Sequence, residues 1–297
     1  MAQDNQELRL SFYGVRGSIP SPGPDTVVYG GNTACLLLET GTDRIIIDAG
    51  TGIRRLGEDL EASLSPGDTL HLFVTHTHWD HIQGLPFFSP IHIPNLTIEV
   101  YGPARYANTL HKIISGQMKS VYFPVDFTDL RAKFHFHPLG EQTFTLDHLQ
   151  VTTRHLNHPI RTLGYRFSHF GKTVVTCYDH EPYAKRVHNS APGKDHEESP
   201  EQLRRGLLHF LHQADLAVYD TQFTDKDFKP GWGHSTVNSA IDNCLAAGVK
   251  HVVLFHHAPS RMDKELDVIL DHARRYVKAQ TGSLQISLAQ EGGSLTV

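Results

Sequence analysis

The chain has 297 residues, of which 39% are hydrophobic and 20% are charged, and its formal net charge at pH 7 is -5. This composition is typical of a globular protein with a full core, and the acidic balance argues against a surface that grips long nucleic acid. A small anionic substrate is not excluded, because bound metal ions can outweigh a mildly acidic surface. The length permits either two average domains or one large domain.

The cysteines and the N-terminus indicate an ordinary intracellular chain. Cys35, Cys177 and Cys244 lie far apart with no CxxC pair, so neither a disulfide framework nor a cysteine zinc site is indicated. The N-terminus has no basic start and no apolar segment, and no run approaches the roughly 18 apolar residues of a membrane span. We therefore expect a cytoplasmic protein without a membrane anchor.

The first part of the chain mixes strands with one helix. A loop rich in glycine, proline and serine separates the first two strands. Apolar residues at 53, 56, 60 and 64 have the spacing of an amphipathic helix. In chain order, strands are predicted over Leu8–Val15, Ala34–Glu39, Arg44–Asp48 and Thr69–Val74, with the helix inside residues 49–64.

The rest of the chain changes its hydrophobic period several times. The middle has the pattern of successive hairpins, and a second run of alternating helices and strands follows it. The predicted elements are a strand over Leu96–Tyr101, a helix over Tyr106–Met118, several short strands between Lys133 and Tyr178, a helix over Pro200–Gln213, a strand over Leu216–Tyr219, a helix over Val237–Ala247, a strand over His251–Phe255, a helix over Asp263–Ala279, and strand-like ends at 284–289 and 294–297.

No linker separates the two halves. Because strands and helices are interleaved in each half, we expect one α/β domain over residues 1–297, with an αββα four-layer sandwich. The polar stretch Arg186–Ser199 contains proline and glycine, which predicts a surface loop.

The segment HTHWDH at residues 76–81 carries the chemistry. His76 and His78 alternate after a buried strand, so in extended geometry both side chains point the same way and can share one metal ion. Asp80 and His81 follow where the chain turns, which lets them reach a second position nearby. Nothing structural requires four nitrogen and oxygen donors in this order after an apolar strand. The segment therefore predicts a metal site.

A two-metal site needs more donors than this segment offers. His158 follows a strand over Leu149–His155, Asp179 follows a strand over Thr173–Tyr178, and His256 follows the strand that ends at Phe255. Each candidate lies just beyond a β-run.

With these residues in view, the chain resembles the metallo-β-lactamase superfamily. HTHWDH matches the HxHxDH signature of that superfamily, and the downstream order His, Asp, His is also the family's. The chain is most similar to the phosphodiesterase branch, which includes tRNase Z and the phosphoribosyl cyclic phosphodiesterases. This similarity rests on FYGVRGSIPSP, YGGNTACLLLETG, IIIDAGTGIRRLG, LNHP, GYRF, GHST and LFHHAP.

The resemblance implies two divalent metal ions per chain, zinc in the first place, with manganese or iron as alternatives. His155 is a rival to His158, and His257 is a rival to His256. We interpret Cys177 as a buried small hydrophobe rather than a metal ligand. The implied ligands are His76, His78 and His158 for one ion, Asp80, His81 and His256 for the other, and Asp179 as a bridge.

His234, in the segment GWGHSTV, distinguishes the phosphodiesterase branch. In that branch this histidine lies beside the metals, whereas lactamases and glyoxalase-type thioesterases lack it. The resemblance implies that His234 stabilises phosphoryl oxygens and donates a proton to the leaving alkoxide. Asp80 could in addition orient the nucleophile, so both are predicted as catalytic residues.

Three further residues are candidates for substrate contact. Asn32 could face the site from its loop or simply form a turn. His257 is the second candidate, and Phe123 is the third. Phe123 lies in an aromatic connection, residues 115–127, that family members place over the active site. This connection, within a possible lid at 115–140, could stack on a base, or its aromatic residues could be core or dimer contacts.

The predicted function is therefore a phosphodiesterase that opens a cyclic or small nucleotide-like phosphodiester by attack of metal-bound hydroxide. Its partner is expected to be a small phosphodiester, with no long nucleic acid and no membrane, and the chain is expected to form a homodimer. Two alternatives stay open: a hydrolase of another class, such as a lactamase or thioesterase, and a cofactor-biosynthesis or oxygen-handling protein on the same fold.

Overall fold

The computed structural model describes residues 7–104, 107–183, 198–280 and 283–297. The chain divides into two compact units. The first unit comprises Met1–Pro22, Gly30–Gly140 and Gln290–Thr296, and the second comprises Gly23–Tyr29, Glu141–Ala289 and Val297. We describe each unit by itself. The expectation of a single domain stays a prediction, and most of the predicted surface loop, 186–199, lies outside the described residues.

The first unit contains a seven-stranded sheet with the strand order β14-β1-β2-β3-β4-β5-β6. The strands from β14 to β3 are antiparallel, and those from β3 to β6 are parallel. The strands are β1 (Arg9–Gly14), β2 (Cys35–Glu39), β3 (Arg44–Ile47), β4 (Thr69–Phe73), β5 (Thr97–Pro103), β6 (Lys133–Leu139) and β14 (Ser294–Thr296).

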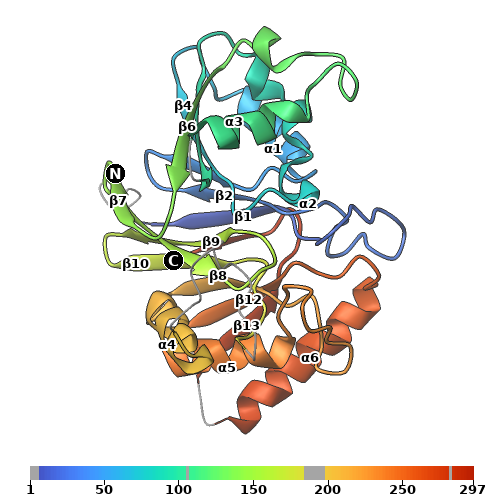
Figure 1. The fold of residues 1–297 in the computed structure, drawn as a ribbon. Coiled ribbons are helices and arrows are strands. Elements are labelled where there is room, and N and C mark those ends of the chain that lie inside the picture. The colour runs from blue at the N-terminus through green and yellow to red at the C-terminus, as the bar shows by residue number, and fades with distance from the viewer. Residues whose placement is uncertain (1–6, 105–106, 184–197, 281–282) are drawn as a thin grey trace. The chain divides into compact units, whose positions relative to one another are not determined.

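Two helices cover one face of this sheet, as Figure 1 shows for α1 and α3. Helix α1 (Ile53–Glu61) buries Ile53, Leu56 and Leu60 against the strands, which confirms the predicted amphipathic helix in a shorter form. The remaining helical elements of the unit are α2 (Trp79–Ile82), α3 (Ala107–Gly116) and the 3-10 helices η2 (Leu85–Phe87), η3 (Ser89–His92) and η4 (Phe127–Asp129).

The second unit contains another seven-stranded sheet, with the order β13-β12-β11-β10-β9-β8-β7. Here β7 to β10 are antiparallel, and β10 to β13 are parallel. The strands are β7 (Thr143–Leu146), β8 (Leu149–Leu156), β9 (Thr162–His169), β10 (Lys172–Cys177), β11 (Leu216–Asp220), β12 (His251–Phe255) and β13 (Gln285–Leu288).

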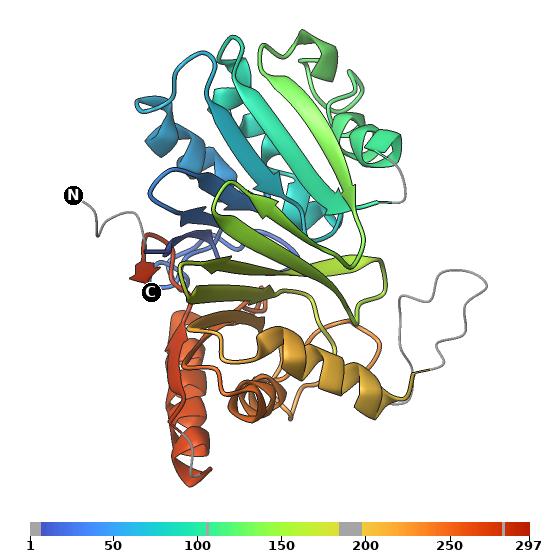
Figure 2. The same cartoon turned by 90° about the vertical axis from the view of Figure 1, so that its left-hand side faces the viewer.

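Three helices pack on one face of the second sheet, and Figure 2 shows them along the same side of their strands. They are α4 (Pro200–Leu211), α5 (Val237–Ala247) and α6 (Asp263–Ala279), each close to its predicted range. Helix α4 begins at a capping box in which the Ser199 side chain accepts from the Gln202 backbone. Cys177 and Cys244 are buried in this core, and burial raises the pKa of the Cys177 thiol, in agreement with its interpretation as a small hydrophobe.

In the part of the chain that the structure describes, we find no helix that combines the length and the apolar character needed to cross a lipid bilayer.

The packing of α1 gives a direct test of the first core. Leu56→Ala removes a fully buried side chain and should lower the free energy of unfolding by about 2–5 kcal/mol. Arg54→Ala on the exposed face of the same helix removes only an ion pair with Glu58 and should change it by about 0.5 kcal/mol at most. Urea unfolding of both variants is the measurement, and similar losses would contradict the described packing.

Candidate metal centre

The histidines of the first unit converge after β4. Nε2 of His76 lies 2.9 Å from Nδ1 of His78, and the His76 ring centroid lies 4.1 Å from that of His81. The predicted alternation therefore brings the imidazoles together. Asp80 and His81 lie in α2, so the expected turn of the chain is a single turn of helix.

Asp48, directly after β3, fixes the orientation of His81. Its carboxylate lies 2.7 Å from Nδ1 of His81 and also accepts from the backbone N–H and the hydroxyl of Thr75, at 2.7 and 2.8 Å. Burial raises the pKa of Asp48, while the contacts with His81 and Thr75 act in the opposite direction. Because Nδ1 of His81 is engaged by Asp48, Nε2 is the nitrogen left to bind a metal ion.

Asp80 is also held by the backbone. Its Oδ2 accepts the N–H of Ser18 at 2.7 Å, and the same oxygen lies 3.3 Å from Nε2 of His81. The chain packs closely beneath this turn, since a Cβ at Gly50 would lie 2.4 Å from the carbonyl oxygen of Asp80. Glycine at position 50 is therefore required for the observed position of the turn.

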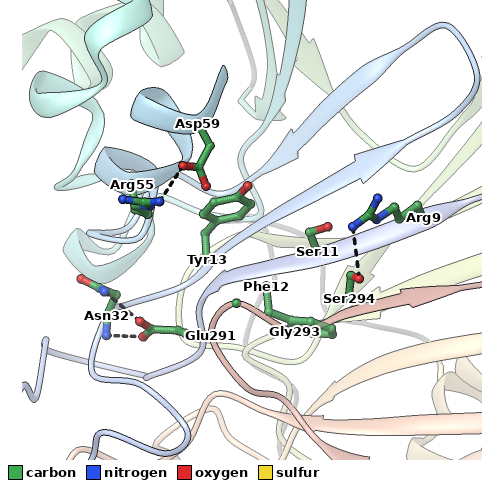
Figure 3. Close-up of a pocket in the computed structure, with 11 residues that line it drawn as sticks. Arg9, Ser11, Phe12, Tyr13, Asn32, Arg55, Asp59, Glu291, Gly293 and Ser294 are labelled. Atoms are coloured by element: carbon green, nitrogen blue, oxygen red, sulfur yellow. Dashed lines mark hydrogen bonds and ion pairs between the residues drawn. The ribbon is translucent and has the colours of Figure 1, made fainter. Parts of the chain in front are cut away.

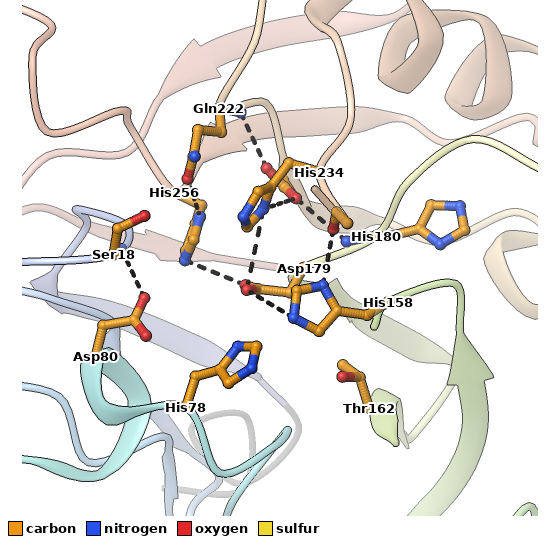
Figure 4. Close-up of polar contacts among 12 residues, drawn as sticks. Ser18, His78, Asp80, His158, Thr162, Asp179, His180, Gln222, His234 and His256 are labelled. Atoms are coloured by element: carbon orange, nitrogen blue, oxygen red, sulfur yellow. Dashed lines mark hydrogen bonds and ion pairs between the residues drawn. The ribbon is translucent and has the colours of Figure 1, made fainter. Parts of the chain in front are cut away.

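The second unit gathers its donors at the carboxyl ends of neighbouring strands. Asp179 follows β10, Asp220 ends β11, and His256 follows β12, and these three strands are parallel. Asp179 Oδ1 lies 3.1 Å from Nε2 of His256, and Asp179 Oδ2 lies 3.7 Å from Nε2 of His158 (Figure 4). All three predicted ligands of this unit thus lie together.

Asp220 was not among the predicted site residues. It is buried and accepts from several groups. Its Oδ2 lies 2.9 Å from Nδ1 of His234 and accepts the N–H of His180 at 3.2 Å. Asp179, Asp220, His234 and His256 offer ligand atoms that all lie within 4.8 Å of one another. An acidic residue at the end of the apolar strand Leu216–Asp220 was the available signal, and it parallels the position of Asp179.

The imidazoles of His158 and His256 are each held by a hydrogen bond from Nδ1. Nδ1 of His158 donates to the carbonyl oxygen of Gly233 at 2.9 Å, and Nδ1 of His256 donates to Oε1 of Gln222 at 3.1 Å. In both residues Nε2 is the nitrogen that faces Asp179. The donor set of nitrogens and carboxylate oxygens, with one tautomer favoured for each ring, suits a divalent ion such as zinc.

Three of these residues have left-handed backbone conformations, which is uncommon outside glycine. The φ angles are 62° at Asp48, 42° at Asp179 and 61° at His256. Such conformations cost roughly 1–3 kcal/mol each and cluster at functional sites. Asp48 and His256 directly follow β3 and β12, and Asp179 lies two residues after β10.

Comparison with known proteins decides the family. The family model described as "Beta-lactamase superfamily domain" matches residues 43–257. The chain belongs to the metallo-β-lactamase superfamily. Its two mixed seven-stranded sheets with flanking helices have the fold of this superfamily, as predicted.

Three relatives illustrate the breadth of the match. Ribonuclease Z of Staphylococcus carnosus (strain TM300) is 24% identical and covers 88% of this chain and 92% of its own length. The metallo-β-lactamase fold protein YhfI from Bacillus subtilis has a TM-score of 0.67 at 17% identity and covers 98% of this chain and 100% of its own. A diphosphatase from the PhnP family has a TM-score of 0.63 at 16% identity and covers 97% of each chain.

His257 and His155, the alternative ligands to His256 and His158, have contacts of their own in the second unit. His257 places Nε2 2.9 Å from the carbonyl oxygen of Ala289 and packs its ring edge-on against Tyr29. His155 is half-buried, and burial lowers its pKa. Neither residue belongs to the second-unit donor group of Asp179, Asp220, His234 and His256. Their proposed roles stay predictions.

Asn32 is engaged within the first unit. Its side-chain amide donates to Oε2 of Glu291 at 2.9 Å, its Oδ1 accepts from Thr51 at 3.1 Å, and its backbone N–H donates to Oε1 of Glu291 at 2.6 Å. Asn32 and Glu291 line a cavity of about 400 Å³ together with Tyr13 and Arg55 (Figure 3). These contacts account for Asn32 as a residue that orders its loop, and its role toward a substrate stays a prediction.

The aromatic connection, residues 115–127, for which a lid and a core or dimer contact were the alternatives, is attached to the first core. Met118 is fully buried there, and Phe123 is half-buried against the core with its ring edge-on to Phe87 at 5.4 Å. Val121 and Tyr122 are exposed. Phe123 thus has a packing role, while stacking on a substrate base stays a prediction.

His180, next to Asp179, gives the second unit a pH-dependent stability. Burial lowers the pKa of His180 to about 3, so the folded protein keeps this imidazole neutral, whereas the unfolded chain binds a proton below about pH 6.5. The unfolded state therefore gains protons first as the pH falls, and the folded state loses stability from about pH 6.5 downward.

His180→Gln should reduce this dependence. Glutamine cannot take up the proton, yet it can still accept the backbone N–H of Asn157, which His180 Nδ1 accepts at 3.1 Å. Between about pH 7 and pH 5 the variant should lose less unfolding free energy than the original chain. Urea unfolding in the presence of a chelator measures the difference, and identical losses would show that His180 is not buried neutral.

Proposed function

We propose that this chain is a metal-dependent phosphodiesterase that hydrolyses a cyclic or small nucleotide-like phosphodiester. The carrying observation is the pair of His234 and Asp220, whose Nδ1 and Oδ2 atoms lie 2.9 Å apart, with Asp179 Oδ2 3.9 Å from the same Nδ1. A histidine held in this way beside a candidate metal ligand, Asp179, is suited to proton transfer to a leaving alkoxide. The similarity to a ribonuclease and to a diphosphatase supports phosphorus chemistry.

The donors fit two divalent ions, most simply zinc, with manganese or iron as alternatives. Nitrogen and carboxylate ligands predominate, and the cysteines are buried away in the cores. Following the resemblance, the first ion would be held by His76, His78 and His158, the second by Asp80, His81 and His256, and Asp179 would contact both.

The bound ions would supply a nucleophilic water near neutral pH and Lewis acidity toward the phosphoryl oxygens. The protein supplies orientation and a proton. As the water oxygen bonds to phosphorus it releases a proton to solvent, and the bond to the leaving alkoxide breaks. The His234 imidazolium gives its Nε2 proton to that alkoxide and then takes up a proton from solvent. Asp220 keeps Nδ1 engaged, so that Nε2 stays directed outward and the imidazolium is stabilised between turnovers.

A substrate panel tests the proposal. Cyclic mononucleotides, cyclic dinucleotides, 2′,3′-cyclic phosphates, bis(p-nitrophenyl) phosphate and precursor tRNA would be assayed with Zn²⁺ and with Mn²⁺. Hydrolysis of a small phosphodiester is the expected result. Turnover of nitrocefin or S-lactoylglutathione, with no phosphodiester hydrolysed, would overturn the proposal.

Replacement of His234 tests the role of the proton donor. His234→Ala should lower turnover of a cyclic nucleotide by roughly 10²–10⁴. The loss on bis(p-nitrophenyl) phosphate should be much smaller, because p-nitrophenolate leaves almost without a proton. His272→Ala, at an exposed position of α6 that contacts Asn238, is the control and should leave both rates unchanged. Equal losses on both substrates would assign His234 to binding of phosphoryl charge instead.

A further inference from the structure

Glu181 is a buried carboxylate, 5% exposed, for which the proposed chemistry has no role. Its oxygens accept backbone N–H groups from a short loop. Gly231 donates to Oε1 at 2.9 Å and to Oε2 at 2.8 Å, and Gly233 donates to Oε2 at 2.8 Å. A carboxylate is costly to bury unless hydrogen bonds compensate, so this residue is committed to holding the loop Gly231–Gly233.

The loop adopts a backbone conformation that requires glycine at two positions. Gly231 and Gly233 have φ angles of 87° and 83°, values that other residues rarely adopt. A Cβ at Gly233 would lie 2.2 Å from Nδ1 of His158, whereas a Cβ at Gly231 would meet no atom within 4 Å. The close approach of backbone to imidazole therefore occurs at Gly233 alone of the two.

The close approach forms a hydrogen bond, in which the carbonyl oxygen of Gly233 accepts from Nδ1–H of His158 at 2.9 Å. One residue thus donates to Glu181 and accepts from His158. Displacement of the loop would release Nδ1, and with it the preference for the tautomer whose Nε2 faces Asp179.

Glu181 also connects the other side of His158. Its backbone N–H donates to the carbonyl oxygen of Asn157 at 2.8 Å, and Nδ2 of Asn157 donates to the Glu181 carbonyl oxygen at 3.1 Å. His234 directly follows Gly233, so the hydrogen bond from Gly233 to Glu181 also holds the backbone next to the proposed proton donor. Glu181 ties together residues 157–158, 179–181 and 231–234.

We propose that Glu181 is a positioning residue of the metal centre. Its carboxylate holds Gly233 so that His158 presents Nε2 as a ligand. The inference rests on the proposed function for the identity of His158 as a ligand, and it concerns metal affinity before any substrate is bound.

Zinc affinity tests this role without an activity assay. The full chain would be stripped of metal and titrated with Zn²⁺ against a fluorescent chelator. Glu181→Ala should weaken binding by about 10–100-fold, the usual effect of losing a residue that orients a ligand. Glu181→Gln keeps one oxygen acceptor and should lose less. Glu141→Gln is the matched control, since Glu141 accepts the backbone N–H of His155 in the same unit. The zinc affinity of this variant should equal that of the original chain.

The glycines provide a second comparison that does not touch the carboxylate. Gly233→Ala should weaken zinc binding more than Gly231→Ala, because both impose the same backbone strain but only the first pushes against His158. In each variant a ¹H–¹⁵N spectrum of the imidazoles should show loss of the protected Nδ1–H signal in parallel with zinc affinity.

The outcomes separate this inference from the proposed function. If Glu181→Ala melts at a lower temperature but binds zinc with unchanged affinity, Glu181 has only a structural role and the inference is overturned. If zinc affinity falls as expected while the original chain hydrolyses no phosphodiester, the inference stands and the assignment of the reaction fails.

Discussion

In each unit, candidate metal-binding imidazoles depend on a hydrogen bond to one ring nitrogen. Asp48 engages His81, Gly233 engages His158, and Gln222 engages His256, in each case through Nδ1. An imidazole with an engaged Nδ1 has a defined tautomer and a defined plane, so that Nε2 is presented as a ligand. Without these acceptors, the same residues would sample several rotamers, and a metal ion would have to order them on binding.

The acceptors can perform this task because they are themselves buried and held. Asp48 accepts from Thr75 as well as from His81, and Asp220 accepts from His180 as well as from His234. In each case a backbone N–H group holds the carboxylate independently of its contact with the imidazole. The strained backbone at Asp48, Asp179 and His256 is maintained by the packing of the parallel strands that precede these residues.

Sheet topology explains why the donors of each unit gather. In the second unit β10, β11 and β12 are parallel neighbours, so their carboxyl ends share one edge. Asp179, Asp220 and His256 therefore lie side by side although up to 77 positions of sequence separate them. In the first unit β3 and β4 are parallel as well, which brings Asp48 next to the segment that begins at Thr75.

The strands, the helices and the residues of the HTHWDH segment were predictable because their signals are local. Hydrophobic period and donor spacing are contained within a few positions. Asp48, Asp220 and Glu181 were not identified, because each acts through partners distant in the chain: Glu181, for example, accepts from residues fifty and fifty-two positions later. An acidic residue at the end of an apolar strand was a signal for the first two. No local pattern indicates that a glutamate will meet a glycine loop.

The metal content of the purified chain is the most direct test of the central claim. A centre of this kind predicts about two divalent ions per chain by elemental analysis, and loss of at least one in Asp179→Ala, since that carboxylate would serve both ions. A preparation that hydrolyses its substrate at full rate with one ion per chain would contradict the two-metal centre.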